Sequence, residues 1–348
     1  MGKQSAIQWT EATWNPVRGC SRVSEGCRHC YAETFGGRFA GEGQPWHGFI
    51  TKHRPGPDGE PVETEPRWTG RVEVIESRLN EPRRWKDPRL VFVNSMSDLF
   101  HEKLAFEEID RVFRVMLQTP QHTYQVLTKR PERASEYLWA RSGSTNRLYL
   151  PNVWLGTSAE DQATLDARAP HLLGAPAALH FLSLEPLLGP VDASRYMWPV
   201  HAVWSSKYNT PEEALADGAL VDYRRQALVS ADRSYVKWVI VGGESGFSAR
   251  PMHPAWARSL RDQCAKSGTA FFFKQEGAWT TRRPSNDKWN ARETVALSDD
   301  GTHFYGIDPA TTSMPRGMVT LFRYVGKNAD PEDWPEDMRV REMPEVIA

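Results

Sequence analysis

Three of the four cysteines in this 348-residue chain lie within eleven residues, at Cys20, Cys27 and Cys30. Six residues separate the first two and two residues separate the last two. Thiolates this close in sequence can face one metal centre without ligands from distant parts of the chain. A disulfide inside the triplet would leave an odd thiol, and Cys264 lies 234 residues after Cys30. The spacing therefore predicts metal ligation.

The number of ligands separates the candidate metals. A structural zinc site takes four ligands, and an iron–sulfur cluster normally takes four cysteines. A three-cysteine loop leaves one coordination position open, or needs a remote fourth ligand such as Cys264 or a histidine. His29 lies between two ligands, so its side chain should point away from a metal that Cys27 and Cys30 share. We favour an open iron–sulfur site, with zinc and a redox or inert role as alternatives.

The same stretch resembles a known family. Three cysteines that end in C-x-x-C and are followed at once by Tyr31 resemble the cluster loop of radical S-adenosylmethionine (radical SAM) enzymes. Most members have three residues in the first gap. The six-residue gap and the leader T-W-N-P-V-R-G-C at Thr13–Cys20 resemble a phage-associated branch of largely unassigned function that also occurs in bacterial chromosomes.

The resemblance implies a 4Fe-4S cluster held by Cys20, Cys27 and Cys30, with the amino and carboxylate groups of SAM on the fourth iron. It also implies that reduction cleaves SAM to a 5′-deoxyadenosyl radical, which abstracts hydrogen from a substrate. An electron donor such as flavodoxin or ferredoxin would supply the electron. The fold that the resemblance implies is a partial (β/α) barrel.

The rest of the chain alternates between two kinds of segment. Helical spacing of apolar residues occurs at 106–117, 131–140 and 254–267. Short apolar runs lie between such segments, as is typical of strands buried on both faces of a parallel sheet. With an early strand near 7–14 there are about seven. We predict an α/β fold, a partial (β/α) barrel of about six to seven parallel strands with insertions and a small C-terminal appendage. The apolar runs are 90–94, 124–128, 153–157, 180–184, 238–242 and 270–274.

Composition suggests where the barrel begins and ends. We expect it to span residues 1–277, with a Gly- and Pro-rich loop insertion at 36–70 and a cap-like insertion at 190–235. Residues 278–348 should form the appendage, packed on the core and including an antiparallel hairpin.

Polar residues follow every apolar run. Ligands of parallel α/β folds bind at the carboxyl ends of the strands, so we expect these residues to form one rim around one pocket. The strand ends read N-S-M-S-D (Asn94–Asp98), T-K-R-P (Thr128–Pro131), G-T-S-A-E (Gly156–Glu160), S-L-E-P (Ser183–Pro186), G-G-E-S-G (Gly242–Gly246) and K-Q-E-G (Lys274–Gly277).

Position along the chain suggests roles for these residues toward SAM. Ser95, Ser97 and Asp98 are candidates for binding its amino group. Lys129 and Arg130 could bind its carboxylate or a substrate phosphate, and the alternative is that they pair with Glu160 or Glu185 in the rim.

The later strand ends offer further candidates. Thr157, Ser158 and Glu160 suit the two hydroxyl groups of a ribose, and Tyr31 should pack beside the adenine. Gly242 and Gly243 allow close approach of backbone to a ligand, and Glu244 supplies a carboxylate. Radical SAM enzymes often use a G-G-E after the second strand, but this one comes late, so that role is not transferred. Glu185 and Lys274 are the candidate catalytic residues, facing substrate or transferring a proton.

Composition excludes several other classes of protein. The chain is 40% hydrophobic and 25% charged with a net charge of −1, and no apolar run approaches the roughly 18 residues of a membrane span. The first 14 residues lack the apolar core of a signal peptide, so we expect a reducing, cytoplasmic location. No Walker loop, G-x-G-x-x-G fingerprint or nucleophile elbow is present.

Several of the 14 tryptophans adjoin cations, as in Arg67-Trp68, Arg83-Arg84-Trp85-Lys86 and Lys288-Trp289. Such pairs can bind single-stranded nucleic acid, although a packed ring beside a snorkelling cation is the more common arrangement. The leading hypothesis is a radical SAM enzyme acting on a nucleic acid base or nucleotide, in modification or repair. The alternatives are an iron–sulfur or zinc module that binds nucleic acid without catalysis, and a metal-stabilised structural protein.

Overall fold

The computed structural model describes residue 5 and residues 7–55, 61–141, 150–197, 235–281, 294–305, 318–323 and 331–344. The chain divides into two compact units. The first comprises Met1–Thr157 with Gly174–Leu179, and the second comprises Ser158–Leu173 with His180–Ala348.

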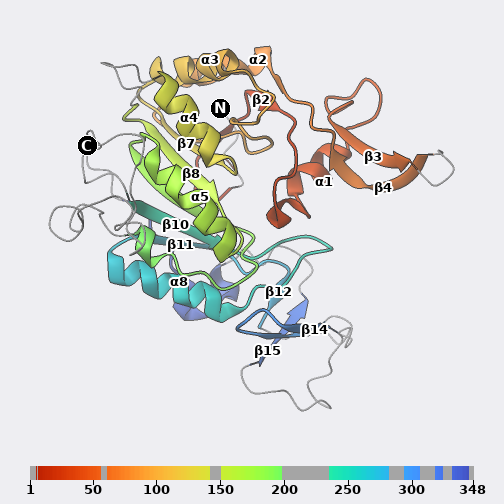
Figure 1. The fold of residues 1–348 in the computed structure, drawn as a ribbon, viewed down its shortest axis with the longest axis vertical. Helices are drawn as coiled ribbons and strands as arrows, with labels where there is room; N and C mark the ends of the chain where they lie inside the picture. Colours follow the sequence, from red (N-terminus) through yellow and green to blue (C-terminus); the bar gives the residue numbers. More distant parts are fainter. Residues whose placement is uncertain are drawn as a thin grey trace, which may run out of the picture. The chain divides into compact units, whose positions relative to one another are not determined.

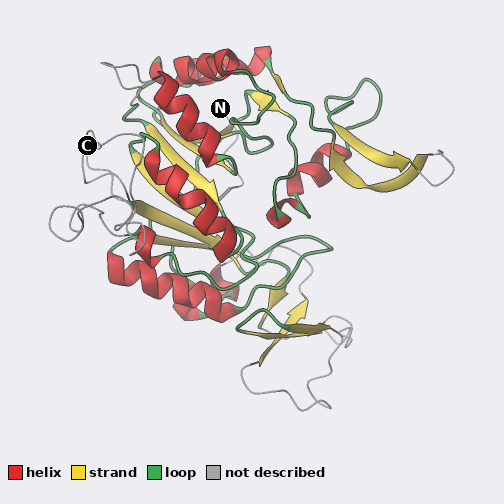
Figure 2. Cartoon of the chain, in the orientation of Figure 1, coloured by secondary structure: helices red, strands yellow, loops and turns green. Residues whose placement is uncertain are grey.

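Seven strands form one sheet in the order β1-β6-β7-β8-β9-β10-β11. Strands β1, β6, β7 and β8 pair in parallel, and so do β9, β10 and β11. The predicted α/β fold with a partial barrel of about seven parallel strands is therefore confirmed (Figures 1 and 2). The bounds are β1 Ala12–Trp14, β6 Leu90–Val93, β7 Thr123–Thr128, β8 Val153–Ser158, β9 Leu179–Leu184, β10 Val236–Gly242 and β11 Ala270–Gln275.

Helices connect most of these strands, as the apolar spacing predicts. Helix α8 shows why its bounds fall where they do: His253 Nδ1 accepts the N–H of Ala255, Pro254 occupies the first turn, and Gly268 ends the helix in the left-handed region with φ of 70°. The helices are α2 Glu76–Leu79, α3 Phe106–Leu117, α4 Pro131–Arg141, α5 Gln162–Gly174 and α8 Pro254–Ser267.

Aromatic side chains fill the core of the first unit. Tyr137 of α4 is fully buried, and its ring centroid lies 5.1 Å from that of Phe113 in α3 and 6.0 Å from that of Phe100. Trp14 at the end of β1 is also fully buried, and its Nε1 donates to the carbonyl of Arg78 at 2.9 Å. This packing holds in place the segments that follow β1, β6 and β7.

The stretch 36–70, predicted as a long loop, contains regular structure. Helix α1 (Tyr31–Gly37) ends in it, and β3 (Ile50–Pro55) pairs with β4 (Pro61–Trp68) as an antiparallel hairpin beside that helix (Figure 1). A Cβ at Gly36 would lie 2.4 Å from Cδ1 of Ile50, and one at Gly37 would lie 2.6 Å from Cγ of Pro66. The glycines that suggested a loop instead allow close packing of helix on hairpin. A second small sheet pairs β2 (Val17–Arg18) with β5 (Glu73–Val74).

The C-terminal part of the second unit forms an antiparallel sheet in the order β12-β15-β13-β14. The predicted hairpin partners, β13 (Thr294–Ser298) and β15 (Met318–Arg323), do pair antiparallel. The other two strands are β12 (Trp279–Thr280) and β14 (His303–Tyr305). Beyond this sheet, Trp334 is fully buried with its ring 4.9 Å from Phe273 of β11.

Most of the cap-like insertion predicted at 190–235 and the pair Lys288-Trp289 lie outside the described residues. Among the residues described, no helix is both long enough and apolar enough to cross a membrane.

The packing of α1 on its hairpin can be tested with one methyl group. Overpacking against the rigid ring of Pro66 costs about 1–3 kcal/mol, whereas Ala gains only about 1 kcal/mol over Gly in a helix. We therefore expect Gly37→Ala to lower the free energy of unfolding by about 1–2 kcal/mol, measured as a fall in Tm. In Gly41→Ala, the control, the nearest atom is Cγ of Gln44 at 3.9 Å. That variant should stay within about 0.5 kcal/mol of the wild type, and equal losses in both would contradict the packing.

Candidate functional site

The three clustered cysteines lie on one loop of the first unit, between β2 and α1. Cys20 follows β2 by two residues, Cys27 ends a 3-10 turn, and Cys30 is the N-cap residue of α1. All three are free thiols and are partly exposed. The fourth cysteine, Cys264, lies in α8 of the second unit, where burial raises its pKa to about 12.

Charged residues that follow two strands, Asp98 after β6 and Arg130 after β7, affect the pKa of Cys20 in the loop. The pKa of its thiol is raised to about 12, chiefly by burial and next by the carboxylate of Asp98. The guanidinium of Arg130 lowers that pKa, while the charges of Cys30 and Cys27 add to the increase. The three sulfurs therefore influence one another electrostatically.

The first turn of α1 and burial act in opposite directions on the pKa of Cys30, whose side chain makes no capping hydrogen bond. Burial has the largest effect and raises its pKa, whereas the backbone N–H groups of Glu33 and Ala32 lower it. Donors of this kind favour a thiolate ligand. In the described parts of the chain, no three or more His, Cys, Asp or Glu side chains are grouped so that they could hold a metal ion. The chemistry of the loop fits a soft metal, but the arrangement of its side chains is not yet a formed site.

Arg130 ties the loop to the ends of β6 and β7. Its Nη2 donates to Oγ of Ser21, the residue after Cys20, at 2.7 Å. Its Nη1 lies 3.1 Å from Oδ2 of Asp98 and its Nε lies 2.8 Å from Oε2 of Glu102. The Arg130 side chain is only 10% exposed. One buried guanidinium thus holds the start of the cysteine loop against two carboxylates.

Asp98 is the centre of this arrangement. Its Oδ1 accepts from Thr128 Oγ1 at 2.7 Å and from the N–H of Phe100 at 3.0 Å. Its Oδ2 accepts from the N–H of Lys129 at 3.0 Å as well as from Arg130. Asp98 therefore joins the ends of β6 and β7, and its predicted role toward the amino group of SAM stays a prediction.

A second set of hydrogen bonds fixes the chain on either side of β2. Ser97 Oγ donates to the carbonyl of Val17 at 2.8 Å, and Ser95 Oγ donates to Oδ1 of Asn15 at 3.2 Å. The hydroxyl of Tyr31 donates to the carbonyl of Ser95. The structure thus brings Tyr31 and the two predicted serines together at the end of β6.

The sequence reasoning did not identify three residues of this network. His101 is fully buried, with Nε2 2.9 Å from Ser21 Oγ and Nδ1 accepting the N–H of Lys103 at 3.2 Å. Ser21 also donates to Oε1 of Glu102 at 3.1 Å. The available signal was position, because Ser21 adjoins a cysteine and the pair His101-Glu102 follows Asp98 by three residues.

Asn94 belongs to the predicted rim, but no role was predicted for it. It directly follows β6 with a φ of 59° and is 3% exposed. Its Oδ1 lies 3.4 Å from the N–H of Val17. Its Nδ2 is buried and has no hydrogen-bond partner in the described part of the structure. An asparagine after an apolar run was the only sequence signal, because asparagine tolerates positive φ.

The two predicted catalytic residues meet in the second unit. Nζ of Lys274, at the end of β11, lies 2.7 Å and 2.8 Å from the carboxylate oxygens of Glu185, which follows β9. Gln275 Nε2 donates to Glu185 Oε1 and to the carbonyl of Gly243, both at 3.1 Å. The side chains of Lys274 and Glu185 are 24% and 19% exposed. They form a partly buried ion pair between two strand ends.

The G-G-E sequence after β10 makes contacts within its own unit. A Cβ at Gly243 would lie 2.0 Å from the carbonyl oxygen of Glu276, and one at Gly242 would lie 3.3 Å from Glu185 Oε1. Glu244 is 7% exposed and accepts from Arg250 through Nη2 at 2.8 Å and Nε at 3.0 Å. The close approach that these glycines permit is therefore to the protein itself.

The predicted ribose contacts are also engaged within the chain. In the first unit, Thr157 Oγ1 donates to the carbonyl of Thr128 at 2.8 Å. In the second unit, Nη1 of Arg168 lies 3.1 Å from Glu160 Oε2 and 2.8 Å from the carbonyl oxygen of Ser158. Glu160 pairs with Arg168, Glu185 with Lys274, and Arg130 with Asp98 and Glu102.

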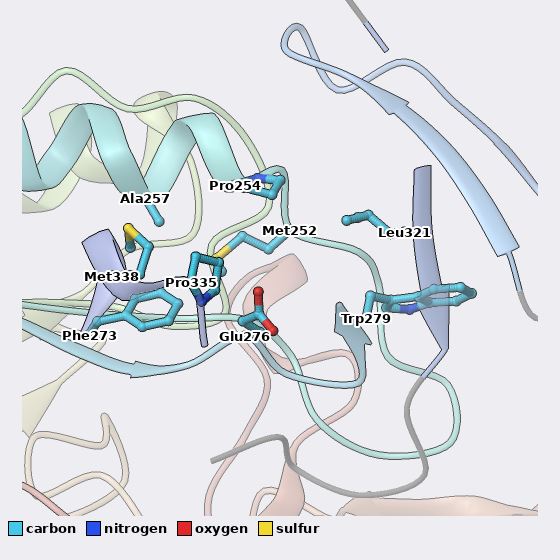
Figure 3. Close-up of a pocket in the computed structure, with 9 residues that line it drawn as sticks. All are labelled: Met252, Pro254, Ala257, Phe273, Glu276, Trp279, Leu321, Pro335 and Met338. Atoms are coloured by element: carbon cyan, nitrogen blue, oxygen red, sulfur yellow. The ribbon is translucent and has the colours of Figure 1, made fainter. Parts of the chain in front are cut away.

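A small cavity lies in the second unit beneath α8 (Figure 3). It offers about 10 Å³ to a water-sized sphere, roughly the room that one water molecule needs. A nucleoside or SAM cannot fit in it. Its lining is mostly apolar and consists of Met252, Pro254, Ala257, Phe273, Glu276, Trp279, Leu321, Pro335 and Met338.

Comparison with known proteins gives one family. A family model described as "Protein of unknown function (DUF5131)" matches residues 4–329. No curated protein and no solved structure gives a significant match. Because that family has no known function, the resemblance to radical SAM enzymes stays a prediction. The match covers most of the chain, so this protein belongs to the DUF5131 family.

Proposed function

We propose that this protein is a radical SAM enzyme in which Cys20, Cys27 and Cys30 hold a 4Fe-4S cluster. The observation that carries the proposal is the loop between β2 and α1, which presents three free, partly exposed thiols beside the ends of β6 and β7. When bound, the cluster supplies the electron that cleaves SAM to a 5′-deoxyadenosyl radical, which then abstracts hydrogen from the substrate. Three cysteines leave one iron open for SAM.

The fold supports the same proposal. A parallel α/β sheet places ligands at the carboxyl ends of its strands. In the first unit the cysteine loop is hydrogen-bonded to residues at those ends, through Ser97 after β6 and Arg130 after β7. In this proposal the amino group of SAM lies near Ser95, Ser97 and Asp98, and its carboxylate lies near Lys129.

Arg130 has a positioning role in this proposal. Its guanidinium group already contacts Asp98, Glu102 and Ser21. Its proposed role is therefore to hold the loop in position and not to bind a ligand. Its positive charge next to Cys20 also lowers the pKa of that thiol, opposing the increase caused by burial and Asp98. Both effects prepare the start of the loop for a metal.

The other candidate residues have proposed roles of their own. The ammonium group of Lys274 can donate a proton and the carboxylate of Glu185 can accept one, so the pair suits proton transfer to or from a substrate. The proposed contacts to the nucleoside part of SAM are Tyr31, Thr157, Ser158 and Glu160, with Gly242, Gly243 and Glu244 at a further strand end.

The proposal also includes a cellular context. The substrate is a nucleic acid base or nucleotide, the electron donor is a small protein such as flavodoxin or ferredoxin, and the location is the cytoplasm. The second candidate is an iron–sulfur or zinc protein that binds nucleic acid without catalysis. It is favoured by exposed aromatic side chains on α1, next to the loop. Cleavage of SAM separates the two candidates.

The ligand assignment is tested with Cys27→Ala. Anaerobically reconstituted wild-type protein should be brown, hold about four irons per chain, and form 5′-deoxyadenosine when dithionite and SAM are added. Cys27→Ala should lose most of the iron and all of the 5′-deoxyadenosine. Cys264→Ala is the control and should keep both, because that thiol lies in α8. Colourless wild-type protein, or full iron in Cys27→Ala, would overturn the assignment.

The role of Arg130 is tested without any metal. Lysine keeps the charge but cannot reach Asp98, Glu102 and Ser21 together. We expect Arg130→Lys to lower the free energy of unfolding by about 1–3 kcal/mol, and to speed reaction of the loop thiols with a thiol reagent in metal-free protein. Arg111→Lys is the control, because Arg111 is 38% exposed and pairs with Glu76 on the surface. It should change unfolding by less than about 1 kcal/mol. Unchanged thiol reactivity in Arg130→Lys would show that Arg130 does not position the loop.

A further inference from the structure

Exposed aromatic side chains of the first unit gather beside the cysteine loop. Tyr31 and Phe35 of α1 are 56% and 48% exposed, and Phe39, just beyond the helix, is 41% exposed. They are spaced by four residues, so they follow one side of the helix. The ring centroids of Phe35 and Phe39 lie 5.6 Å apart. We call these three side chains the aromatic face.

Buried contacts prevent the aromatic face from turning inward. Gly36 and Gly37 on the other side of α1 pack against the β3–β4 hairpin. Glu33 is 2% exposed, and both of its carboxylate oxygens accept from Arg22 Nε at 3.0 Å. Glu33 Oε1 also accepts the N–H of Trp68 in β4 at 2.9 Å. The helix is therefore fixed in rotation, with its aromatic side chains held in solvent.

The charge around the aromatic face favours an anionic partner. Arg38, between Phe35 and Phe39 in sequence, is exposed. Glu33 is the only carboxylate between residues 31 and 39, and it is buried and paired with Arg22. The exposed face therefore combines three rings with a cation and has no exposed acid of its own. That combination complements a chain of flat bases joined by phosphates.

The location of this face links it to the cysteine loop. Tyr31 directly follows Cys30, and its hydroxyl donates to the carbonyl of Ser95 at the end of β6. Phe35 follows Tyr31 by about one turn of α1, and Phe39 lies just beyond the end of the helix. A ligand lying along the rings would end beside Cys30.

The described tryptophans that suggested nucleic acid binding from the sequence pack against other rings of the first unit. The ring centroid of Trp68 lies 5.7 Å from that of Trp46, and Trp85 lies 5.5 Å from His122 with Arg89 over its ring at 5.5 Å. These rings pack within the first unit, which is the more common arrangement for such pairs.

We propose that the aromatic face binds single-stranded nucleic acid, with bases stacked on Tyr31, Phe35 and Phe39 and phosphates near Arg38. The proposal rests on the proposed function only in making that strand the substrate. Stacking on aromatic rings tolerates any sequence, because every base has a π face. The face therefore selects single strands over duplexes, whose bases already stack on one another.

The test measures fluorescence anisotropy of labelled oligo-dT, oligo-rU and a duplex, each about twelve nucleotides long, with the full-length protein. We expect both single strands, or one of them, to bind more tightly than the duplex. Removing two stacked rings in Phe35→Ala/Phe39→Ala should weaken binding by at least about 20-fold. Arg38→Gln should weaken it less and lower the salt dependence by about one phosphate contact.

Phe304→Ala is the matched control. Phe304 has the same side chain and is 51% exposed, but it lies on β14 of the second unit. Its variant should bind as the wild type does. A loss equal to that of the double variant would assign the effect to exposed phenyl rings in general and overturn the proposal.

Other outcomes also decide the question. No binding of either single strand by the wild-type protein, or equally tight binding of the duplex, would overturn the proposal. So would a double variant that keeps oligonucleotide binding but no longer binds flavodoxin, which would make the face a protein-docking surface. Formation of 5′-deoxyadenosine by wild-type protein without oligonucleotide reports on the proposed function alone. The binding assay needs neither cluster nor SAM, so failure of one proposal is distinguishable from failure of the other.

Discussion

The first unit depends on one buried guanidinium. Taking a cation out of water costs several kcal/mol, which is recovered only when nearly every donor finds an acceptor. Arg130 meets that condition through Asp98, Glu102 and Ser21. Because those partners come from the end of β6, the turn after it and the cysteine loop, the guanidinium has one satisfactory position. Its main contribution is then to the position of the loop at Ser21 rather than to net stability.

This constraint explains why the polar strand ends are mostly engaged within the protein. A half-buried carboxylate without a partner is costly, and four acidic residues of these ends pair with a cation from their own unit, while Glu276 accepts from Thr280 Oγ1. The same holds for hydroxyl groups, since Ser97 and Thr157 donate to backbone carbonyls. A ligand at any of these ends must use remaining lone pairs or exchange partners with an existing pair. The ion pairs are Asp98–Arg130, Glu160–Arg168, Glu185–Lys274 and Glu244–Arg250.

The sheet was predictable from the sequence, because a strand buried on both faces must be apolar throughout. All six apolar runs became neighbouring strands, and the short β1 was found near its expected place. The hairpin of β3 and β4 was not predictable by the same rule. Its alternation is broken by a register shift between Thr51 and His53 and by Pro66, and its packing depends on two glycines of another element. The sequence shows such glycines only as a sign of a turn.

The candidate site was predictable in its residue types but not in its pairings. Position after a strand placed Asp98, Arg130, Glu185 and Lys274 in the predicted rim, and in the structure Arg130 contacts Asp98 and Lys274 contacts Glu185. The carboxylate and the cation of a pair lie tens of residues apart in sequence, as Lys274 and Glu185 do, so the sequence does not show which of them meet. Ser21 could not be selected, because a serine beside a cysteine has no pattern of its own. Its importance comes from its contacts with Arg130, His101 and Glu102.

Two arginines, Arg22 and Arg130, place positive charge near the sulfurs of the cysteine loop. Arg22 has a raised pKa, first because it hydrogen-bonds to Glu33 and further because of the charges of Cys30 and Cys27. For Arg130, burial lowers the pKa and the charges of Asp98 and Cys20 raise it by more. Each arginine is thus already neutralised in large part by a carboxylate, Arg22 by Glu33 and Arg130 by Asp98 and Glu102. Burial raises the pKa of Cys20 and of Cys30, whereas a soft metal bound at these sulfurs would favour their thiolate form, because thiolates are the ligands that such metals prefer.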